Sequence, residues 1–438
     1  MFDPVRLLET KKVGLPHPAA DIRALVDGYV AGAVPDYQMS AWLMAVRLNG
    51  MDAAETLAYT DALLHSGSTY SWDGLDRPVV DKHSSGGVGD KTSLVVVPLA
   101  AACGLAMPKI SGRGLGLTGG TLDKLESIPG LQLDLDEAEF RAQIGRVGCA
   151  IVAQSDELVP ADGLTYALRE VTASTDSVPL IAASIMCKKL ATGAGTIVLD
   201  VKCGSGAFMV DVAAARELAT AMVGIGNGAG RTVRAFVTAM DAPLGTAVGH
   251  SLEVAEALAT LRGEGPADLV ELALTLVAAL VRDSGLRPAP RAARELSEKM
   301  LGNGTAYARM EEMIAAQGGD LAAFDQAPTH AGKTRLVVEA PESGYIAAID
   351  AEAVALTVRG LGGGRLTKID AIDLGVGVVL ARKTGQSVER GAPLAEVYAA
   401  DDVAAENAAA RLREAIRIRP EQPAATPLVL EQLGGALQ

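Results

Sequence analysis

Apolar residues recur at helical spacing in the first part of the chain. Over residues 57–64 they fall on one face of a helix, and Asp52 followed by Glu55 matches a capping box at its start. A similar pattern over residues 40–51 predicts another helix. We therefore expect the first 66 residues to be helical, with a short polar stretch behind them.

A different pattern begins at residue 79, where short β-branched runs alternate with Gly-rich turns and helical segments. The apolar stretch 94–108 contains two prolines, so it is interpreted as a buried strand followed by a helix, not as a membrane span. The alternation favours βα units on a mainly parallel sheet. Strands are predicted over 94–97, 151–153, 196–201 and 232–239, and helices over 213–223 and 269–281.

Short strands with frequent glycine follow from about residue 335. Segment 383–394 is typical of a hairpin from a small lipoyl-like β-sandwich, but it lacks the lysine that a carrier protein places at the hairpin tip. We therefore expect a structural C-terminal domain and not a carrier. Its strands are predicted over 354–358, 375–381, 386–391 and 393–397, and a helix over 401–416.

Composition narrows the class of protein. Of 438 residues, 49% are apolar but only 3% are aromatic, so the core must consist of Ala, Val, Leu and Ile. These values exclude a disordered, collagen-like or disulfide-rich chain. The N-terminal residues show no apolar signal core, which makes the cytoplasm the expected location. Four cysteines without CxxC spacing fit core positions in a reducing compartment: Cys103, Cys149, Cys187 and Cys203.

The formal net charge is −14. A chain of this charge repels nucleic acid and anionic lipid at long range, so we expect neither as a partner. An anionic ligand therefore needs a local basic pocket.

Residues 81–93 (DKHSSGGVGDKTS) supply one candidate for such a pocket. Glycines let backbone N–H groups approach an anion, while hydroxyls and lysine add further donors. The segment is not a P-loop, because Asp90 separates Gly89 from Lys91. The alternative is an ordinary Gly-rich turn between a strand and a helix.

A second candidate lies in residues 109–130. Gly114, Gly116 and Gly119 match GxGxxG, but this match is weak because glycines continue on both sides. The hydroxyls of Ser111, Thr118 and Thr121 have no role in a dinucleotide turn. Two loops of this kind in one sheet suit a single inorganic phosphate.

A third segment places Ser184 and Lys188 four residues apart, on one face of a helix that begins near Ile181. Together with Arg169, these side chains suit the carbonyl and N–H edge of a heterocycle. The alternative is that Arg169 and Lys188 are solvated helix charges.

Together these segments resemble the pyrimidine-nucleoside phosphorylases over essentially the whole chain. The resemblance is most specific in residues 111–116 with 118–130, and residues 82–89 and 200–208 support it. It implies a homodimer with no cofactor beyond phosphate as co-substrate, and domains separated by a cleft that closes on substrates. The implied fold class is α/β, with a discontinuous helical domain (1–66 and 160–192), a mainly parallel α/β domain (67–159 and 193–334) and a small C-terminal α+β domain (335–438).

The resemblance also implies a site. Phosphate is expected at Lys82, Ser84, Ser93, Ser111 and Thr121. The pyrimidine is expected at Arg169, Ser184 and Lys188, with Tyr166 nearby, Lys109 near the sugar and His83 close to O2 of the base and the sugar. Leu117 stands where many members have histidine, so a polar role at that position is absent.

The implied reaction is reversible phosphorolysis of pyrimidine nucleosides (thymidine, uridine and deoxyuridine) to the free base and a pentose 1-phosphate. His83, Arg169 and Lys188 are its expected catalytic residues. Two alternatives remain. One is a phosphoribosyltransferase like the anthranilate enzyme, which would need acidic magnesium ligands. The other is a non-catalytic nucleoside-binding protein, which would not need lysine, serine and threonine at all five phosphate positions.

Some members of the family hold a potassium ion near the domain hinge. The matching positions are Gly89, Lys91, Leu244, Ala247 and Glu256. Lys91 replaces a hydroxyl residue of some relatives, and its ammonium would compete with a cation.

Overall fold

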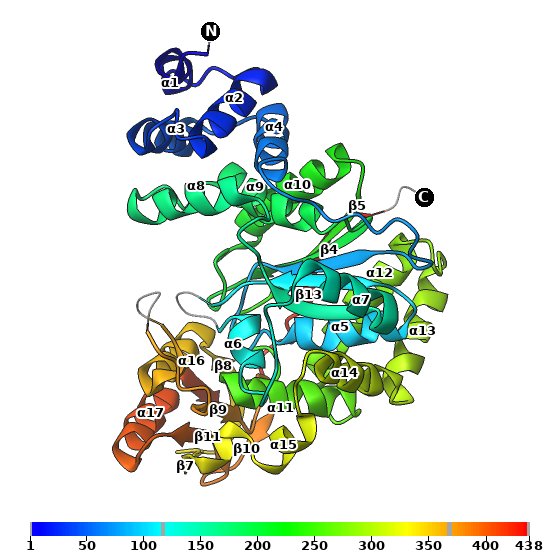
Figure 1. Cartoon of the computed structure of the whole chain (residues 1–438). Helices are drawn as coiled ribbons and strands as arrows, with labels where there is room; N and C mark the ends of the chain where they lie inside the picture. Colours follow the sequence, from blue (N-terminus) through cyan, green and yellow to red (C-terminus); the bar gives the residue numbers. More distant parts are fainter. Residues whose placement is uncertain (1, 115–118, 366–369, 436–438) are drawn as a thin grey trace.

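A helical unit is built from two segments that lie far apart in the sequence. In the computed structural model, which describes residues 2–114, 119–365 and 370–435, helices α8 and α9 pack against the N-terminal helices through one buried apolar cluster. Figure 1 shows this unit above the rest of the molecule. Its helices are α1 (Pro4–Lys12), α2 (Ala19–Val30), α3 (Asp36–Asn49), α4 (Ala53–Leu64), α8 (Pro160–Val171) and α9 (Val178–Ala191).

The predicted capping box at the start of α4 is confirmed. The Asp52 carboxylate accepts from the Glu55 backbone N–H at 2.8 Å, and the Glu55 carboxylate accepts from the Asp52 N–H at 3.1 Å. Glu55 also binds the buried ammonium of Lys11 at 2.8 Å, so this cap joins α4 to α1.

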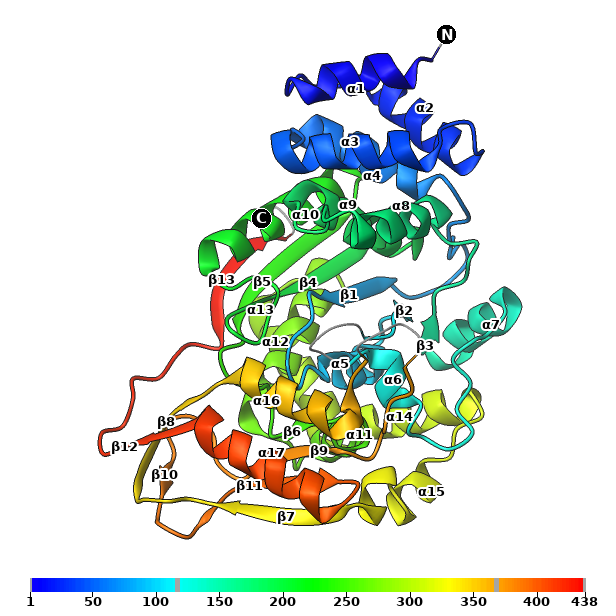
Figure 2. The same ribbon diagram turned by 90° about the vertical axis from the view of Figure 1, so that its left-hand side faces the viewer.

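The centre of the molecule is a mainly parallel sheet in the order β1-β4-β5-β13. A two-stranded parallel sheet, β2-β3, continues it through a bridge between Val79 and Ala106. Figure 2 shows β1, β4 and β5 below the helical unit. The strands are β1 (Val80–Ser84), β2 (Met107–Ser111), β3 (Cys149–Ala153), β4 (Thr196–Cys203), β5 (Thr232–Ala239) and β13 (Val429–Gly434).

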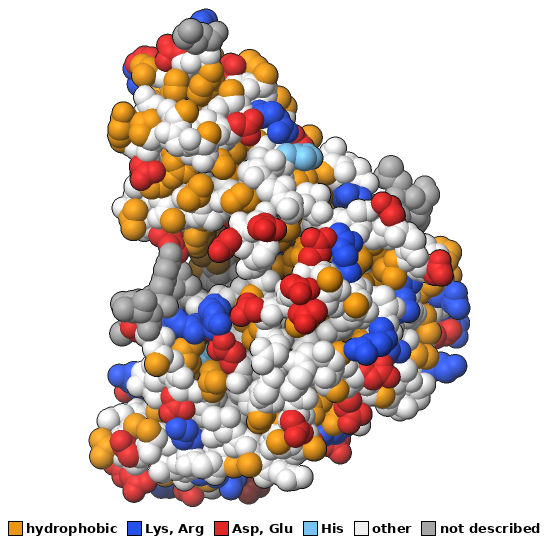
Figure 3. All heavy atoms as spheres, viewed as in Figure 1, with side chains coloured by type: hydrophobic (Ala, Val, Ile, Leu, Met, Phe, Trp, Pro, Cys, Tyr) orange, Lys and Arg blue, Asp and Glu red, His pale blue; other side chains and the backbone are white. Residues whose placement is uncertain are grey.

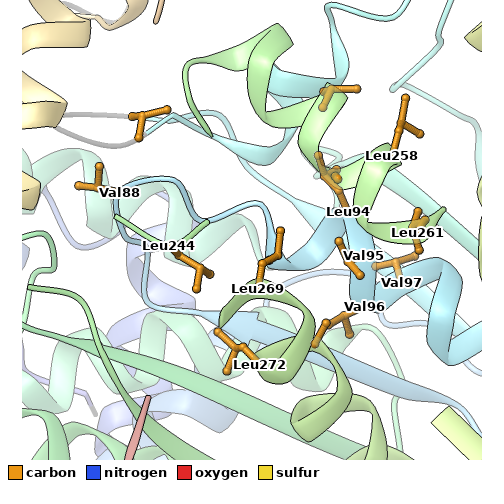
Figure 4. Packing of buried hydrophobic residues seen from close by; sticks show 14 of the residues in the cluster. Val88, Leu94, Val95, Val96, Val97, Leu244, Leu258, Leu261, Leu269 and Leu272 are labelled. Atoms are coloured by element: carbon orange, nitrogen blue, oxygen red, sulfur yellow. The ribbon is translucent and has the colours of Figure 1, made fainter. Parts of the chain in front are cut away.

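Helices cover this sheet and supply most of the core. They are α5 (Thr92–Ala102), α6 (Thr121–Leu125), α7 (Glu137–Val147), α10 (Val212–Gly228), α11 (His250–Leu261), α12 (Ala267–Asp283), α13 (Pro290–Gly302), α14 (Thr305–Ala316) and α15 (Leu321–Gln326). Figure 4 shows Leu94 to Val97 of α5 packed with leucines of α11 and α12.

The prediction of a strand over 94–97 is wrong, because these residues belong to α5. Residues 94–97 are completely buried, so no alternation of polar and apolar positions distinguishes a helix from a strand there. The strand of this stretch, β2, follows the helix instead of preceding it.

The C-terminal domain contains two small antiparallel sheets. One has the order β10-β8-β12, and the other has the order β6-β9-β11-β7. Helices α16 (Ala351–Val358) and α17 (Asp402–Ala415) pack on them. The strands are β6 (Ala247–Val248), β7 (Thr334–Glu339), β8 (Gly344–Ile349), β9 (Gly377–Leu380), β10 (Ser387–Val388), β11 (Pro393–Ala399) and β12 (Ile416–Arg419).

Two predictions for this domain are wrong. Residues 354–358 are helical, since the Asp350 carboxylate caps α16 and Val354 and Val358 share its buried face. Segment 383–394 is not a hairpin, because β10 and β11 lie in different sheets. The chain also returns to the central sheet after residue 419, where β13 pairs with β5.

None of the helices in the described residues has both the length and the apolar character that a membrane span requires.

Candidate functional site

One cleft brings together the residues that the sequence motifs single out. It has a volume of about 800 Å³ and is lined by residues of α8 and α9 on one side and of β1, β2 and their loops on the other. In Figure 3 the surface is hollowed between the upper helical part and the body below it. Ten predicted site residues line the cleft: His83, Ser84, Ser93, Lys109, Ser111, Thr121, Tyr166, Arg169, Ser184 and Lys188.

Lys82 lies beneath the cleft and not on its wall. Its ammonium is fully buried and has no hydrogen-bond partner among the described residues, although the Asp200 carboxylate lies 3.8 Å away. Burial lowers the pKa of Lys82, and the charges of Asp90 and Asp200 oppose this shift. A buried polar group without a partner is costly, so this position favours an anion.

Three residues with hydroxyl groups line the cleft from different elements. Ser93 lies in the first turn of α5, Ser111 ends β2, and Thr121 begins α6. None of their hydroxyls is engaged by another residue in the described parts of the chain. The Ser84 hydroxyl, by contrast, donates to the Asp90 carboxylate. Leu117 and Thr118, also singled out in the sequence, lie outside the described residues.

Asp90 is more than an interruption of a P-loop pattern. Its carboxylate also accepts from Thr92, at 3.1 Å from the backbone nitrogen and 2.5 Å from the hydroxyl. Burial would raise the pKa of Asp90, but the ammonium groups of Lys82, Lys202 and Lys124 outweigh it and hold this pKa well below its usual range. Asp90 is therefore ionised and fixes the Gly-rich loop.

A second cluster of charges lies around the opposite face of β1. The Asp81 carboxylate binds the Lys189 ammonium at 2.8 Å and lies 3.5 Å from that of Lys109. Burial lowers the pKa of His83 well below 6.5, and four neighbouring ammonium groups lower it further. The His83 imidazole is therefore neutral near pH 7.

Arg169 is held in the wall of the cleft by the backbone that follows its helix. Its nitrogens donate to the carbonyl oxygens of Ser174 at 3.2 Å, Thr175 at 2.9 Å and Leu180 at 3.1 Å. The side chain is buried, so it is not a solvated helix charge. A guanidinium has five N–H donors, and these contacts leave some of them available to a ligand.

Lys188 is oriented by a carboxylate. Its ammonium lies 2.7 Å from Asp162 and donates to the Ser184 hydroxyl at 3.4 Å. Burial would lower the pKa of Lys188, but Asp162 outweighs it and raises this pKa. Lys188 therefore stays protonated beside the cleft.

Sequence reasoning missed several residues of this site. Asp162, Lys189 and Asp81 lie close in sequence to residues that were singled out, but nothing in their spacing shows that they pair across elements. Phe208 also lines the cleft and is exposed. The available signal for it was a lone aromatic residue at the end of the Gly-rich segment 200–208.

The five positions expected for potassium also come together. The Lys91 ammonium stands among them, 2.9 Å from the carbonyl oxygen of Leu244, 2.8 Å from that of Ala247 and 2.5 Å from the Glu256 carboxylate. Gly89 adjoins the same carbonyls, since a Cβ at that position would lie 2.6 Å from the Leu244 carbonyl oxygen and 3.2 Å from that of Ala247.

Comparisons with known families agree with the three structural parts. Residues 5–67 match the helical bundle domain of the glycosyl transferase family, and residues 76–307 match the α/β domain of the same family. Residues 345–419 match the pyrimidine nucleoside phosphorylase C-terminal domain.

Curated relatives match along almost the entire chain. A pyrimidine-nucleoside phosphorylase of Geobacillus stearothermophilus is 44% identical over 98% of this chain and 99% of its own length. A thymidine phosphorylase of Rhizobium meliloti is 42% identical over 98% of both chains. A pyrimidine-nucleoside phosphorylase of Bacillus subtilis is 44% identical over 90% of this chain and 92% of its own length.

A solved structure shares the fold. It is the anthranilate phosphoribosyltransferase of Thermus thermophilus, with a TM-score of 0.59, 19% identity and coverage of 71% of this chain and 98% of that one. At this identity the likeness concerns the architecture alone.

Proposed function

The chain belongs to the pyrimidine-nucleoside phosphorylase family, and we propose that it catalyses the reversible phosphorolysis of pyrimidine nucleosides at the cleft described above. Phosphate attacks the anomeric carbon, the bond to the base breaks, and the products are the free base and a pentose 1-phosphate. The observation that carries this assignment is the fully buried ammonium of Lys82, which has no hydrogen-bond partner among the described residues. Lys82 directly precedes His83 and Ser84 in β1, and both of these residues line the cleft together with Ser93, Ser111 and Thr121.

Lys82 with Ser84, Ser93, Ser111 and Thr121 binds the phosphate. Phosphate oxygens are strong acceptors, and a charge-assisted bond to a buried ammonium is stronger than one between neutral groups. Phosphate is already a competent oxygen nucleophile, so this account needs no activated serine or cysteine. The bound anion also faces the positive charge that develops on the sugar.

Arg169, Ser184 and Lys188 bind the base, with Tyr166 beside them. Negative charge grows on the base as the glycosidic bond breaks, so two cations near it stabilise the transition state more than the ground state. Asp162 is a positioning residue, because it holds the Lys188 ammonium and keeps it protonated.

His83 acts as a neutral hydrogen-bond donor to O2 of the base. Its low pKa excludes an imidazolium as the resting form near pH 7, so polarisation of the carbonyl is favoured over delivery of a proton. Closure of the cleft would align both reactants and exclude water, which prevents hydrolysis.

Uridine, thymidine and deoxyuridine are the proposed substrates, and the proposed location is the cytoplasm.

A homodimer is also proposed, and large apolar side chains exposed on the helical unit support it. They include Val13, Leu15, Tyr37, Leu48 and Val171. Figure 3 shows apolar atoms gathered over this part of the molecule.

The competing reaction is that of a phosphoribosyltransferase. Magnesium bound to a diphosphate is held by carboxylates, and among the described residues that line the cleft Asp90 is the acidic one, already engaged by Ser84 and Thr92. The cleft therefore supports phosphorolysis.

The test is an assay of uridine and thymidine with and without phosphate, in the presence of EDTA. Both nucleosides should be consumed only when phosphate is present. Consumption without phosphate, or a requirement for magnesium, would contradict the proposal.

A further inference from the structure

Lys91 occupies a place that is built from oxygen atoms. Its side chain is completely buried, and its ammonium lies within 2.9 Å of the Leu244 and Ala247 carbonyl oxygens and of the Glu256 carboxylate. An ammonium has three N–H donors, and these oxygens supply three acceptors. The site is therefore satisfied by a group of the chain itself.

The oxygens are held in place independently of Lys91. The Glu256 carboxylate accepts from the backbone N–H of Thr246 at 2.9 Å and from that of Ala247 at 3.1 Å. The Leu244 N–H donates to the Val88 carbonyl at 3.1 Å, and Figure 4 shows Val88 and Leu244 side by side. The site thus joins the Gly-rich loop before α5 to the loop that leads into α11.

Carbonyl oxygens arranged around one point are also how proteins replace the hydration shell of potassium. The family implies a potassium ion at these positions, but the ion and the Lys91 ammonium cannot occupy the same point. The residues of this chain therefore do not fit a bound potassium ion.

A second lysine, Lys383, also donates hydrogen bonds to carbonyl oxygens of the loop 243–247. The Lys383 ammonium donates to the carbonyl oxygens of Pro243 and, at 2.6 Å, of Gly245, and it lies 3.0 Å from the Asp268 carboxylate. Four carbonyls between residues 243 and 247 thus point at two ammonium groups from other parts of the chain. The loop therefore binds cations, and in this protein these cations are the side-chain ammonium groups of Lys91 and Lys383.

We propose that the Lys91 ammonium is a tethered monovalent cation, which fills the site between Leu244, Ala247 and Glu256 and makes the protein independent of potassium. Removal of this side chain should leave a site that accepts a free monovalent cation. The Glu256 carboxylate should stay in place in such a variant, because the backbone N–H groups of Thr246 and Ala247 also hold it.

The test compares thermal unfolding in KCl, NH4Cl and choline chloride at equal ionic strength. The melting temperature reports the stability of the fold and does not depend on an activity assay. The melting temperature of the wild type should be the same in KCl and choline chloride. Lys91→Thr shortens the side chain and adds a hydroxyl oxygen. It should melt several degrees lower in choline chloride and recover with KCl or NH4Cl in a saturable way, as expected for a ligand that binds the folded state.

Lys91→Met is the matched control, because it keeps the length of the side chain but fills the site with apolar atoms. It should melt lower than the wild type and show no recovery with KCl. The proposal is overturned if KCl stabilises the wild type relative to choline chloride, a measurement that requires no variant to fold. It is also overturned if Lys91→Thr melts at the same temperature in both salts.

Discussion

The Lys188 ammonium lies 2.7 Å from the Asp162 carboxylate, and this pair joins α8 to α9, the two helices that line one side of the cleft. Asp162 is buried, whereas the Lys188 side chain is 32% exposed toward the cleft. In the proposed mechanism, the carboxylate holds a protonated lysine near the place where charge develops on the leaving base.

Replacement of Asp162 by Asn should lower kcat more than it raises KM. The amide keeps the volume but removes the charge that holds Lys188, and one charge-assisted bond is worth about 1.5–3 kcal/mol, roughly a 10- to 100-fold change in rate. Lys188 must be protonated, and loss of Asp162 lets burial lower its pKa. The alkaline limb of the pH profile of kcat should therefore move to lower pH.

The control for this experiment is Asp27→Asn, which removes an exposed carboxylate from α2 of the same helical unit. A purely structural role of Asp162 would lower stability and leave the alkaline limb unmoved, and that outcome would count against the assignment.

Lys82→Met should weaken phosphate binding about 10- to 100-fold, because a charge-assisted bond to a buried ammonium is lost. Isothermal titration with phosphate measures this directly. Nucleoside binding should change little, since Lys82 is buried and does not line the cleft in which Arg169, Ser184 and Lys188 lie. The exposed Lys299→Met on α13 controls for the loss of one positive charge. Unchanged phosphate affinity in Lys82→Met would remove the observation on which the phosphate site rests.

His83 should make the stability of the protein depend on pH below 6.5. Its pKa in the folded protein lies well below 6.5, its value in the unfolded chain. Between the two values the unfolded chain binds a proton that the folded protein does not, so the free energy of unfolding falls as the pH is lowered and recovers as it rises. Urea unfolding at pH 7.5 and 5.5 should show a larger loss for the wild type than for His83→Gln.

Equal losses in the two proteins would show that His83 titrates normally in the folded state. The exposed His65→Gln serves as the control, because it removes an imidazole from the surface of the helical unit.

Lys109→Met should lower activity on uridine more than on thymidine. The Lys109 side chain is buried at the wall of the cleft, two residues before Ser111, and its ammonium also lies 3.3 Å from the Ile110 carbonyl oxygen. A polar donor there can bond a 2′-hydroxyl, whereas methionine would leave that hydroxyl without a partner. The ratio of kcat/KM values for the two nucleosides measures the effect. An equal decrease of kcat/KM for uridine and thymidine would mean that Lys109 contributes to phosphate binding and not to recognition of the 2′-hydroxyl.

Secondary structure could be predicted from the sequence where a segment has a helix-capping residue or a periodic pattern of apolar residues. Asp52 and Glu55 marked the start of α4, and the helices α10, α12 and α17 lie where helical segments were predicted. Completely buried segments carry no such period, so Leu94 to Val97 gave the wrong element. The return of β13 to the central sheet depends on a contact across 190 residues and more, which no local pattern encodes.

The candidate site likewise contains residues that the sequence reveals and residues that only the structure reveals. The residues proposed to bind substrates lie in recognisable motifs, and ten of them line one cleft. The charged partners of these residues come from other elements: Asp162 pairs with Lys188, and Asp81 lies beside Lys109 and Lys189. Such pairs depend on the three-dimensional packing of α8, α9, β1 and β2, so sequence spacing does not reveal them.

The central claim is that phosphate, held above Lys82, is the nucleophile that displaces the base. The most direct measurement is a reaction of uridine with phosphate labelled by ¹⁸O at all four oxygens, followed by ³¹P NMR of the product. The account predicts a pentose 1-phosphate that retains all four labelled oxygens, with the free base formed in equal amount. Free pentose formed together with unchanged labelled phosphate would contradict it, because water would then be the nucleophile.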